Sequence, residues 1–141
     1  MSAELIELSN ALALSTDRAA GSAVAVHTET RGSSSGVVWR PGVVVTAEHA
    51  LRRDEEIHLT LPDGRVVAAT LAGRDPSTDI AVLKCAEAVT AVREFGEVTS
   101  LNPGCLTLVV GLLTSCGKTY LGKCLLRIIS NLLGPRSWLN L

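Results

Sequence analysis

The first residues of the chain repeat apolar side chains at helical intervals. Leu5, Leu8 and Leu12 follow one another at spacings that place them on one face of an α-helix. Ser2 can cap the first turn, and Gly21 suits the position just past the last one. The pattern therefore predicts a short amphipathic helix within residues 1–21 that packs outside the core.

From Ser22 onward the pattern changes to short β-branched runs separated by turn residues. Two of the connections have good turn chemistry: Arg40-Pro41-Gly42-Val43 fits a type II turn and Leu61-Pro62-Asp63-Gly64 fits a type I turn. No long helical pattern alternates with the runs, as the crossovers of a parallel sheet would require. The spacing predicts an all-β barrel or sandwich of antiparallel strands. The runs are residues 23–26, 36–39, 43–46, 57–61, 66–71 and 80–83.

The texture changes again after Gly111. Residues 112–141 are rich in leucine, contain two of the four cysteines, and show little strand alternation outside 125–129. The stretch 131–141 would expose apolar surface unless something covered it. We expect this part to be either the start of a second barrel or a degenerate tail.

Composition and charge remove several classes of function. With 141 residues and 47% hydrophobic side chains, the chain can bury one sizeable core. Lys and Arg number 13 against 14 Asp and Glu, and aromatic residues make up 3%, so binding to nucleic acid is not expected. No apolar run is long enough to span a membrane, and the first residues do not have the pattern of a signal peptide. A cytoplasmic location is the default expectation, and the oligomeric state stays open.

The cysteines and two of the histidines suggest no metal or cofactor site. Cys85, Cys105, Cys116 and Cys124 form no Cys-x-x-Cys pair, so free thiols are expected. His27 and His58 have no metal-type partners nearby in the sequence and are expected at the surface. No cofactor is predicted.

Two segments carry residue types that suggest hydrolytic chemistry. Residues 43–50 form a strand-like run that leads into His49, and residues 75–84 place Asp79 at the start of another strand. A serine hydrolase uses an imidazole to take the proton of the nucleophile and a buried carboxylate to orient that imidazole. His49 and Asp79 have the right chemistry, and the residues between them leave room for a hairpin.

The sequence around these residues is similar to that of a known protein family. Gly36-Val37-Val38, then Thr46-Ala47-Glu48-His49, then Thr78-Asp79-Ile80-Ala81-Val82-Leu83-Lys84 resembles, in order and spacing, the first half of the HtrA/DegP-type trypsin-like serine proteases. The resemblance implies a double β-barrel, with residues 22–111 as the first, Greek-key barrel and 112–141 as an incomplete second one. It also implies His49 as the general base, Asp79 as its orienting carboxylate, and polypeptides as substrates.

The chain departs from the family at the nucleophile. Such proteases carry their serine in a Gly-x-Ser-Gly-Gly segment after both partners, and no such segment is present here. The serines that follow Asp79 lack flanking glycines: Ser100, Ser115, Ser130 and Ser137. We therefore expect a protease truncated before its catalytic serine and inactive by itself. The alternative is a pseudoprotease module that binds polypeptide at an open barrel edge.

Two other motifs are weaker. Gly32-Ser33-Ser34-Ser35-Gly36 matches the nucleophile elbow of α/β-hydrolases, with Ser34 as the serine, but a strand rather than a helix follows it. We interpret it as a flexible polar turn. Residues 111–119 imitate a phosphate-binding loop with one residue too many between the glycines, which favours a surface loop.

Overall fold

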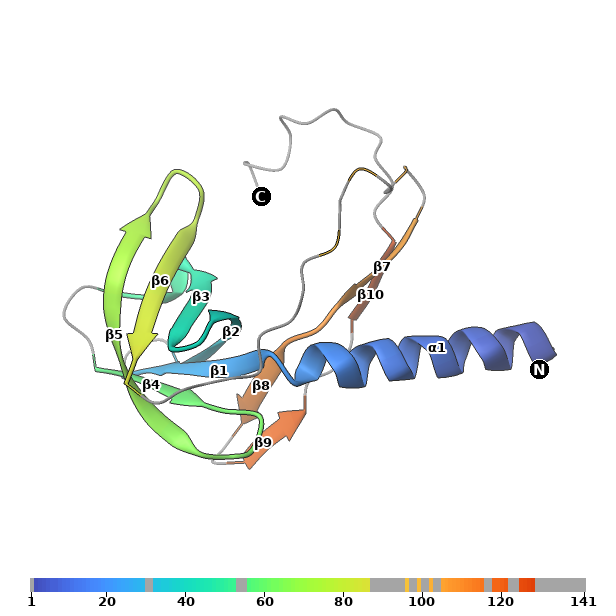
Figure 1. Ribbon diagram of the computed structural model, residues 1–141, viewed down its shortest axis with the longest axis horizontal. Coiled ribbons are helices and arrows are strands. Elements are labelled where there is room, and N and C mark those ends of the chain that lie inside the picture. The colour runs from blue at the N-terminus through green and yellow to red at the C-terminus, as the bar shows by residue number, and fades with distance from the viewer. Residues whose placement is uncertain are drawn as a thin grey trace.

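The computed structural model describes residues 2–29, 32–52, 56–86, 96, 99, 102, 105–115, 118–121 and 125–128. One helix precedes a series of strands that alternate with short turns (Figure 1). The barrel elements in chain order are α1 (Ala3–Ala20), β1 (Ala23–Thr28), β2 (Gly32–Arg40), β3 (Val43–Ala47), η1 (Glu48–Ala50), β4 (Ile57–Thr60), β5 (Val66–Asp75) and β6 (Ile80–Cys85). They are followed by β7 (Leu106–Val109), β8 (Leu112–Ser115), β9 (Lys118–Leu121) and β10 (Leu125–Ile128).

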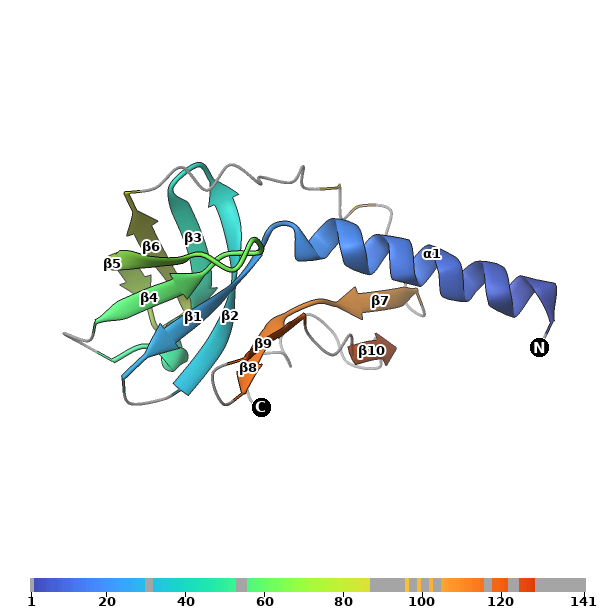
Figure 2. The same cartoon turned by 90° about the horizontal axis from the view of Figure 1, so that it is seen from below.

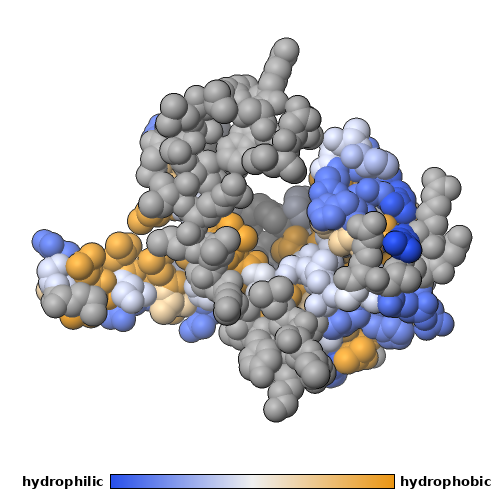
Figure 3. Space-filling view, turned by 180° about the vertical axis from the view of Figure 1, so that it is seen from behind, coloured by the Kyte–Doolittle hydropathy of each residue, from blue (hydrophilic) through white to orange (hydrophobic). Residues whose placement is uncertain are grey.

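Helix α1 projects away from the barrel, as both ribbon views show (Figures 1 and 2). Leu5 and Leu8 are 54% and 43% exposed, and Ala20 is the buried residue of the helix. Apolar side chains consequently lie along its surface (Figure 3). The sequence placed the helix correctly, but Ser2 makes no side-chain capping bond, and Gly21 keeps a right-handed backbone with φ −63°.

Six antiparallel strands close into a barrel in the order β1-β2-β3-β6-β5-β4 (Figure 2). Because β3 pairs with β6 and β4 returns to pair with β1, the connectivity is that of a Greek key. The all-β prediction and its six strand-like runs are confirmed. The barrel does not have the open edge that the pseudoprotease alternative uses, since the pairing of β1 with β4 closes the ladder.

The core lies inside this barrel and is almost entirely aliphatic. Alternate residues of each strand point inward, so that Val44 of β3, Leu59 of β4 and Leu83 of β6 are fully buried. Each such side chain contributes about 1.5–3 kcal/mol through burial of apolar surface. This packing holds β3 and β6 together, and the adjoining ends of those two strands carry His49 and Asp79.

Both predicted turns are present. Gly42 has φ +72°, as the third residue of a type II turn requires. In the other, the Gly64 amide donates to the Leu61 carbonyl at 2.9 Å, and Gly64 itself has φ +86°. A type I turn followed by a left-handed glycine is a standard three-residue hairpin connection.

The serine-rich segment is a strand, which corrects the prediction of a flexible turn. Residues 32–36 begin β2 and pair with β1, with Ser34 opposite Val26 and Ser35 opposite Ala25. A glycine is needed at position 36, where β2 begins to pair with β3, because a Cβ there would lie 2.9 Å from Val44 Cγ1. The ladder with β1 runs along the whole of this segment, and the ladder with β3 begins at Gly36.

Beyond the barrel, two short antiparallel pairs follow: β7 with β10 and β8 with β9. Leu112 at the start of β8 is buried against Ala23 and Ala25 on the outside of β1, and its carbonyl accepts a 3.0 Å bond from Ser35 Oγ. The stretch that imitates a phosphate-binding loop is therefore bounded by a strand on each side, and the predicted surface loop is corrected to a hairpin whose residues 116 and 117 lie outside the described residues. A phosphate-binding loop would be followed by a helix.

Within the described residues, no helix is long and apolar enough to cross a membrane.

Candidate active site

His49 sits in a short turn directly after a buried strand. Strand β3 places Val44 and Thr46 inward, and Thr46 Oγ1 donates to the Ser35 carbonyl at 2.8 Å. The strand ends at Ala47, and the three residues of η1 then turn the chain outward. The His49 side chain is 71% exposed, so it is presented at the rim of the barrel.

Asp79 is presented by the tight connection between β5 and β6. The carboxylate of Asp75 accepts bonds from the Ser77 amide at 2.9 Å, from Ser77 Oγ at 2.6 Å and from Thr78 Oγ1 at 2.9 Å. This Asx turn fixes the loop. Asp79 then adopts φ +56°, a left-handed conformation that Asp tolerates better than most residues.

The pairing of β3 with β6 brings the two residues together. Ala47 is opposite Ile80 in the ladder, so the residues just beyond them meet. His49 Nδ1 lies 2.7 Å from Asp79 Oδ2, and the His49 backbone amide donates to Asp79 Oδ1 at 2.9 Å. The Glu48 amide also donates to the Asp79 carbonyl at 3.1 Å. One aspartate thus holds both the turn and the ring.

This contact decides the protonation of the pair. The backbone amide of His49, and then its ring, lower the pKa of Asp79 below the usual range, because both donate hydrogen bonds to the ionised carboxylate. An ionised carboxylate only accepts hydrogen bonds, so Nδ1 carries the proton in this contact, and Nε2 is the nitrogen with the lone pair whenever the ring is neutral. The arrangement leaves Nε2 able to take a proton from a neighbouring hydroxyl.

The expected burial of the carboxylate is not found. The Asp79 side chain is 48% exposed, and the described residues leave that fraction open to solvent. Solvent weakens the interaction between an imidazolium and a carboxylate. The electrostatic interaction between His49 and Asp79 would be stronger if other residues shielded Asp79 from solvent.

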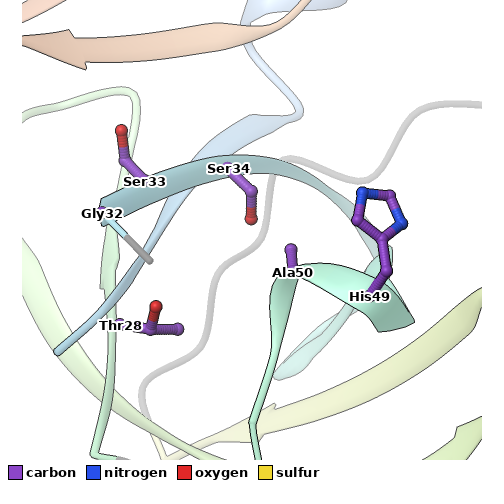
Figure 4. A pocket seen from close by; sticks show the side chains of 6 residues that line it. All are labelled: Thr28, Gly32, Ser33, Ser34, His49 and Ala50. Atoms are coloured by element: carbon purple, nitrogen blue, oxygen red, sulfur yellow. The ribbon is translucent and has the colours of Figure 1, made fainter. Parts of the chain in front are cut away.

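A cavity of about 230 Å³ lies beside the imidazole (Figure 4). His49 and Ala50 of η1 form one side, and Ser33 and Ser34 of β2 form another. Ser34 Oγ is buried and has no hydrogen-bond partner among the described residues. Hydroxyl groups of Thr28, Ser33 and Ser34 therefore line the cavity together with the His49 ring.

Sequence reasoning missed one pair at the site, Glu48 and Arg74. Arg74 is the next-to-last residue of β5, and its guanidinium contacts the Glu48 carboxylate beside His49. The only signal in the sequence was position, since Glu48 directly precedes His49 and Arg74 directly precedes the segment 75–84. Opposite charges far apart in sequence cannot be paired without the ladder that aligns them.

His27 is not the surface residue that the sequence predicted. It is half-buried on the outside of β1, directly opposite His58 of β4, and its Nε2 lies 2.8 Å from Thr60 Oγ1. Burial, and to a lesser degree the charge of His58, lower the pKa of His27. His58 is exposed, as expected.

The described residues contain no group of three or more histidine, cysteine or acidic side chains arranged to hold a metal ion. Cys85 and Cys105 are not joined in a disulfide, while Cys116 and Cys124 lie outside the described residues.

Comparison with known proteins agrees with the geometry. Residues 34–124, which include both His49 and Asp79, match the model of the trypsin-like peptidase domain. The chain is 33% identical over 107 residues to the serine protease Do-like HtrA of Lactobacillus helveticus, covering 72% of this chain and 25% of that protein. It is 42% identical over 57 residues to the serine endoprotease DegS of Escherichia coli strain K12, covering 40% and 16%.

The fold has the same relatives. The crystal structure of the serine endoprotease from Yersinia pestis superimposes with a TM-score of 0.71 at 28% identity, covering 84% of this chain and 44% of that one. The resemblance to HtrA/DegP-type proteases drawn from the sequence is confirmed. The chain spans a quarter or less of the length of the two curated relatives named here.

Proposed function

Because the chain belongs to the trypsin-like peptidase domain family, we propose that it supplies the base and the orienting carboxylate of an HtrA/DegP-like serine endopeptidase. The observation that carries the proposal is the 2.7 Å contact between His49 Nδ1 and Asp79 Oδ2. In this role, His49 Nε2 removes the proton of a serine hydroxyl as its oxygen bonds to the carbonyl carbon of a peptide. It later returns the proton to the departing amine.

Asp79 acts through His49 rather than on the substrate. Its carboxylate selects the tautomer with a proton on Nδ1 and stabilises the imidazolium that forms when Nε2 is protonated. The lowered pKa of Asp79 keeps the carboxylate ionised across the neutral range. The bond to the His49 amide adds a constraint that a ring contact alone lacks, because it ties the aspartate to the backbone that carries the ring.

The second part of the proposal is that residues 1–141 do not cleave peptide bonds by themselves. The serines after Asp79 lack the glycine-rich surroundings that let backbone amides stabilise an oxyanion. Ser34 lies near the imidazole, but as part of a paired strand it cannot offer the strained elbow of a nucleophile. The chain therefore has a base with no competent nucleophile to serve.

Labelling with a fluorophosphonate probe tests the second part. We expect no covalent adduct and no release of fluorescent peptides from labelled casein, at levels indistinguishable from the His49→Ala variant. The Yersinia pestis serine endoprotease serves as the positive control. An adduct on any serine that depends on His49 would contradict the proposed inactivity.

Joining the chain to a nucleophile tests the first part. A chimera of residues 1–111 with the remainder of the protease domain of the Yersinia pestis enzyme would place a serine beside His49. We expect peptidase activity that disappears in His49→Ala while cooperative thermal unfolding is retained. Undiminished activity in the folded variant would exclude His49 as the base.

The alternative, a pseudoprotease that binds polypeptide, has less support than it had from the sequence. It relied on an open barrel edge, and the pairing of β1 with β4 closes that edge. Strand addition needs unpaired backbone groups, which a closed barrel does not offer.

A further inference from the structure

The guanidinium of Arg74 contacts η1, the turn that carries His49. Arg74 Nε donates to Glu48 Oε1 at 2.6 Å, Arg74 Nη2 donates to the same oxygen, and Nη2 also lies 3.5 Å from the Leu51 carbonyl. The two side chains are 26% and 12% exposed. They are much better shielded than His49 and Asp79, at 71% and 48%.

These contacts reach both ends of η1. Glu48 is its first residue and Leu51 follows its last, with His49 between them. The turn is only three residues long, and across its end the Leu51 amide donates to the Glu48 carbonyl at 3.0 Å. Three-residue 3₁₀ turns have poor hydrogen-bond geometry and depend on their surroundings.

The same stretch of chain also controls the aspartate. Arg74 is followed by Asp75, whose carboxylate folds the loop that presents Asp79. The Asp79 carbonyl also accepts from the Glu48 amide at 3.1 Å. Residues 74–79 therefore contact η1 at two points, through the Arg74 side chain and through Asp79.

We propose that the Arg74–Glu48 ion pair is a positioning device that holds η1 so that His49 Nδ1 meets Asp79. The proposal deepens the proposed function, on which it rests for its catalytic meaning. The hydrogen bond between His49 and Asp79 is open to solvent, and water competes for both groups. The Arg74–Glu48 ion pair is better shielded, and two guanidinium nitrogens donate to one carboxylate oxygen of Glu48, the residue before His49. It supplies the rigidity that the exposed His49–Asp79 pair lacks.

The test uses nuclear magnetic resonance on the 141-residue chain. The readouts are the His49 Nδ1–H proton signal, assigned by its loss in His49→Gln, and the titration of the Asp79 carboxyl carbon. The Arg74→Gln variant breaks the pair but leaves the Glu48 carboxylate shielded and unpaired. The double variant Glu48→Ala/Arg74→Ala breaks the pair and leaves no such charge. Arg65→Gln is the matched control, because Arg65 pairs with Asp63 at 2.7 Å in another turn.

We expect both Arg74 variants to lose the Nδ1–H signal and to raise the pKa of Asp79 toward the usual range, while the sheet amides keep their dispersion. Arg65→Gln should leave both readouts unchanged and raise the pKa of Asp63 only in part, because the backbone amide of residue 65, which the variant keeps, lowers that pKa most and the Arg65 side chain lowers it next. A pair that served only to neutralise a shielded charge would let the double variant recover the signal.

Two outcomes would overturn the proposal. One is a folded double variant in which the His49 signal and the Asp79 titration are unchanged. The other is global unfolding of both Arg74 variants where Arg65→Gln is folded, since the pair would then stabilise the barrel rather than the turn. Neither readout involves a substrate, so a dyad that is intact but inactive in the chimera would contradict the proposed function and leave this inference standing.

Discussion

The Asp79 carboxylate binds His49 twice, once at the ring through Oδ2 and once at the backbone amide through Oδ1. The ring contact sets the tautomer of the imidazole, and the amide contact fixes the position of the His49 backbone that carries the ring. A substitution at Asp79 therefore changes both the chemistry of the imidazole and the position of the turn. A substitution at Asp75 should change only the loop in which Asp79 lies.

The folded chain should lose stability in acid because of its hydrogen-bonded aspartates. Asp63, Asp75 and Asp79 all have lowered pKa values, chiefly from hydrogen bonds to the ionised carboxylate. The unfolded chain then binds more protons than the folded chain as the pH falls below the usual aspartate pKa, about 4. Their stabilising contribution is present above that pH and is lost as the pH falls through the lower folded-state values.

Asp79→Asn should make the loss of stability in acid smaller. The acid limb, which is the fall of the thermal midpoint between neutral pH and about pH 2, should be less steep in this variant. Asp63→Asn should also flatten it, but it should leave the His49 Nδ1–H signal in place, which separates the two sites. An acid limb of unchanged slope in Asp79→Asn would contradict the assigned hydrogen bonds.

The titration of His27 should depend on His58, which lies opposite it across the two strands. Burial and the charge of His58 both hold the pKa of His27 below its ordinary value of 6.5. Because the folded-state pKa of His27 is lowered, its contribution to stability is present above the ordinary pKa of 6.5. That contribution is lost as the pH falls from there through the lower folded-state pKa. His58→Gln removes the second cause, so the pKa of His27 should rise but stay below the ordinary value.

The imidazole carbon protons of His27 report this titration directly. His49→Gln is the control, since it removes a histidine from a different part of the barrel. A His27 titration that is identical in the parent chain and in His58→Gln would exclude the coupling.

Gly36→Ala should destabilise the barrel by about 1–3 kcal/mol, the usual cost of overpacking a well-packed core. The added Cβ would lie 2.9 Å from Val44 Cγ1, 3.1 Å from Val26 Cγ2 and 3.1 Å from the Val45 carbonyl oxygen. None of these atoms is the end of a long flexible side chain. Urea denaturation followed by circular dichroism measures the change.

Gly73→Ala is the matched control for this substitution. A Cβ at Gly73 meets nothing within 4 Å, and its backbone is outside the left-handed region. We expect a change between neutral and about 1 kcal/mol more stable, through reduced freedom of the unfolded chain. Equal stabilities for the two variants would show that Gly36 is not confined as described.

Much of this fold was readable from the order of residues. The β-branched runs predicted all six barrel strands, and the Pro41-Gly42 and Leu61–Gly64 turns follow from local backbone preferences. His49 and Asp79 were predicted from their places at strand ends together with the resemblance of the surrounding sequence to HtrA/DegP-type proteases, and the strand order brings the two residues together. Local pattern carries this kind of information well.

The errors concern what depends on partners distant in sequence. The segment around Ser34 was interpreted as a flexible polar turn once the nucleophile elbow had been rejected, yet it pairs with β1, where Ser34 lies opposite Val26. The closure of β4 onto β1 and the burial of His27 also arise from pairing. Arg74 and Glu48 could not be matched by charge alone, since many other pairs of opposite charge were possible in the same chain.

The most direct test of the central claim is kcat/KM for peptide hydrolysis in the chimera that carries Asp79→Asn, compared with Asp75→Asn. Both variants remove one carboxylate from the same loop, but only Asp79 contacts His49. We predict a loss of about 10⁴-fold for Asp79→Asn, as expected when the orienting carboxylate of such a triad is replaced, and a loss of at most about tenfold for Asp75→Asn. Similar losses in the two variants, or near-parent activity in folded Asp79→Asn, would contradict the account.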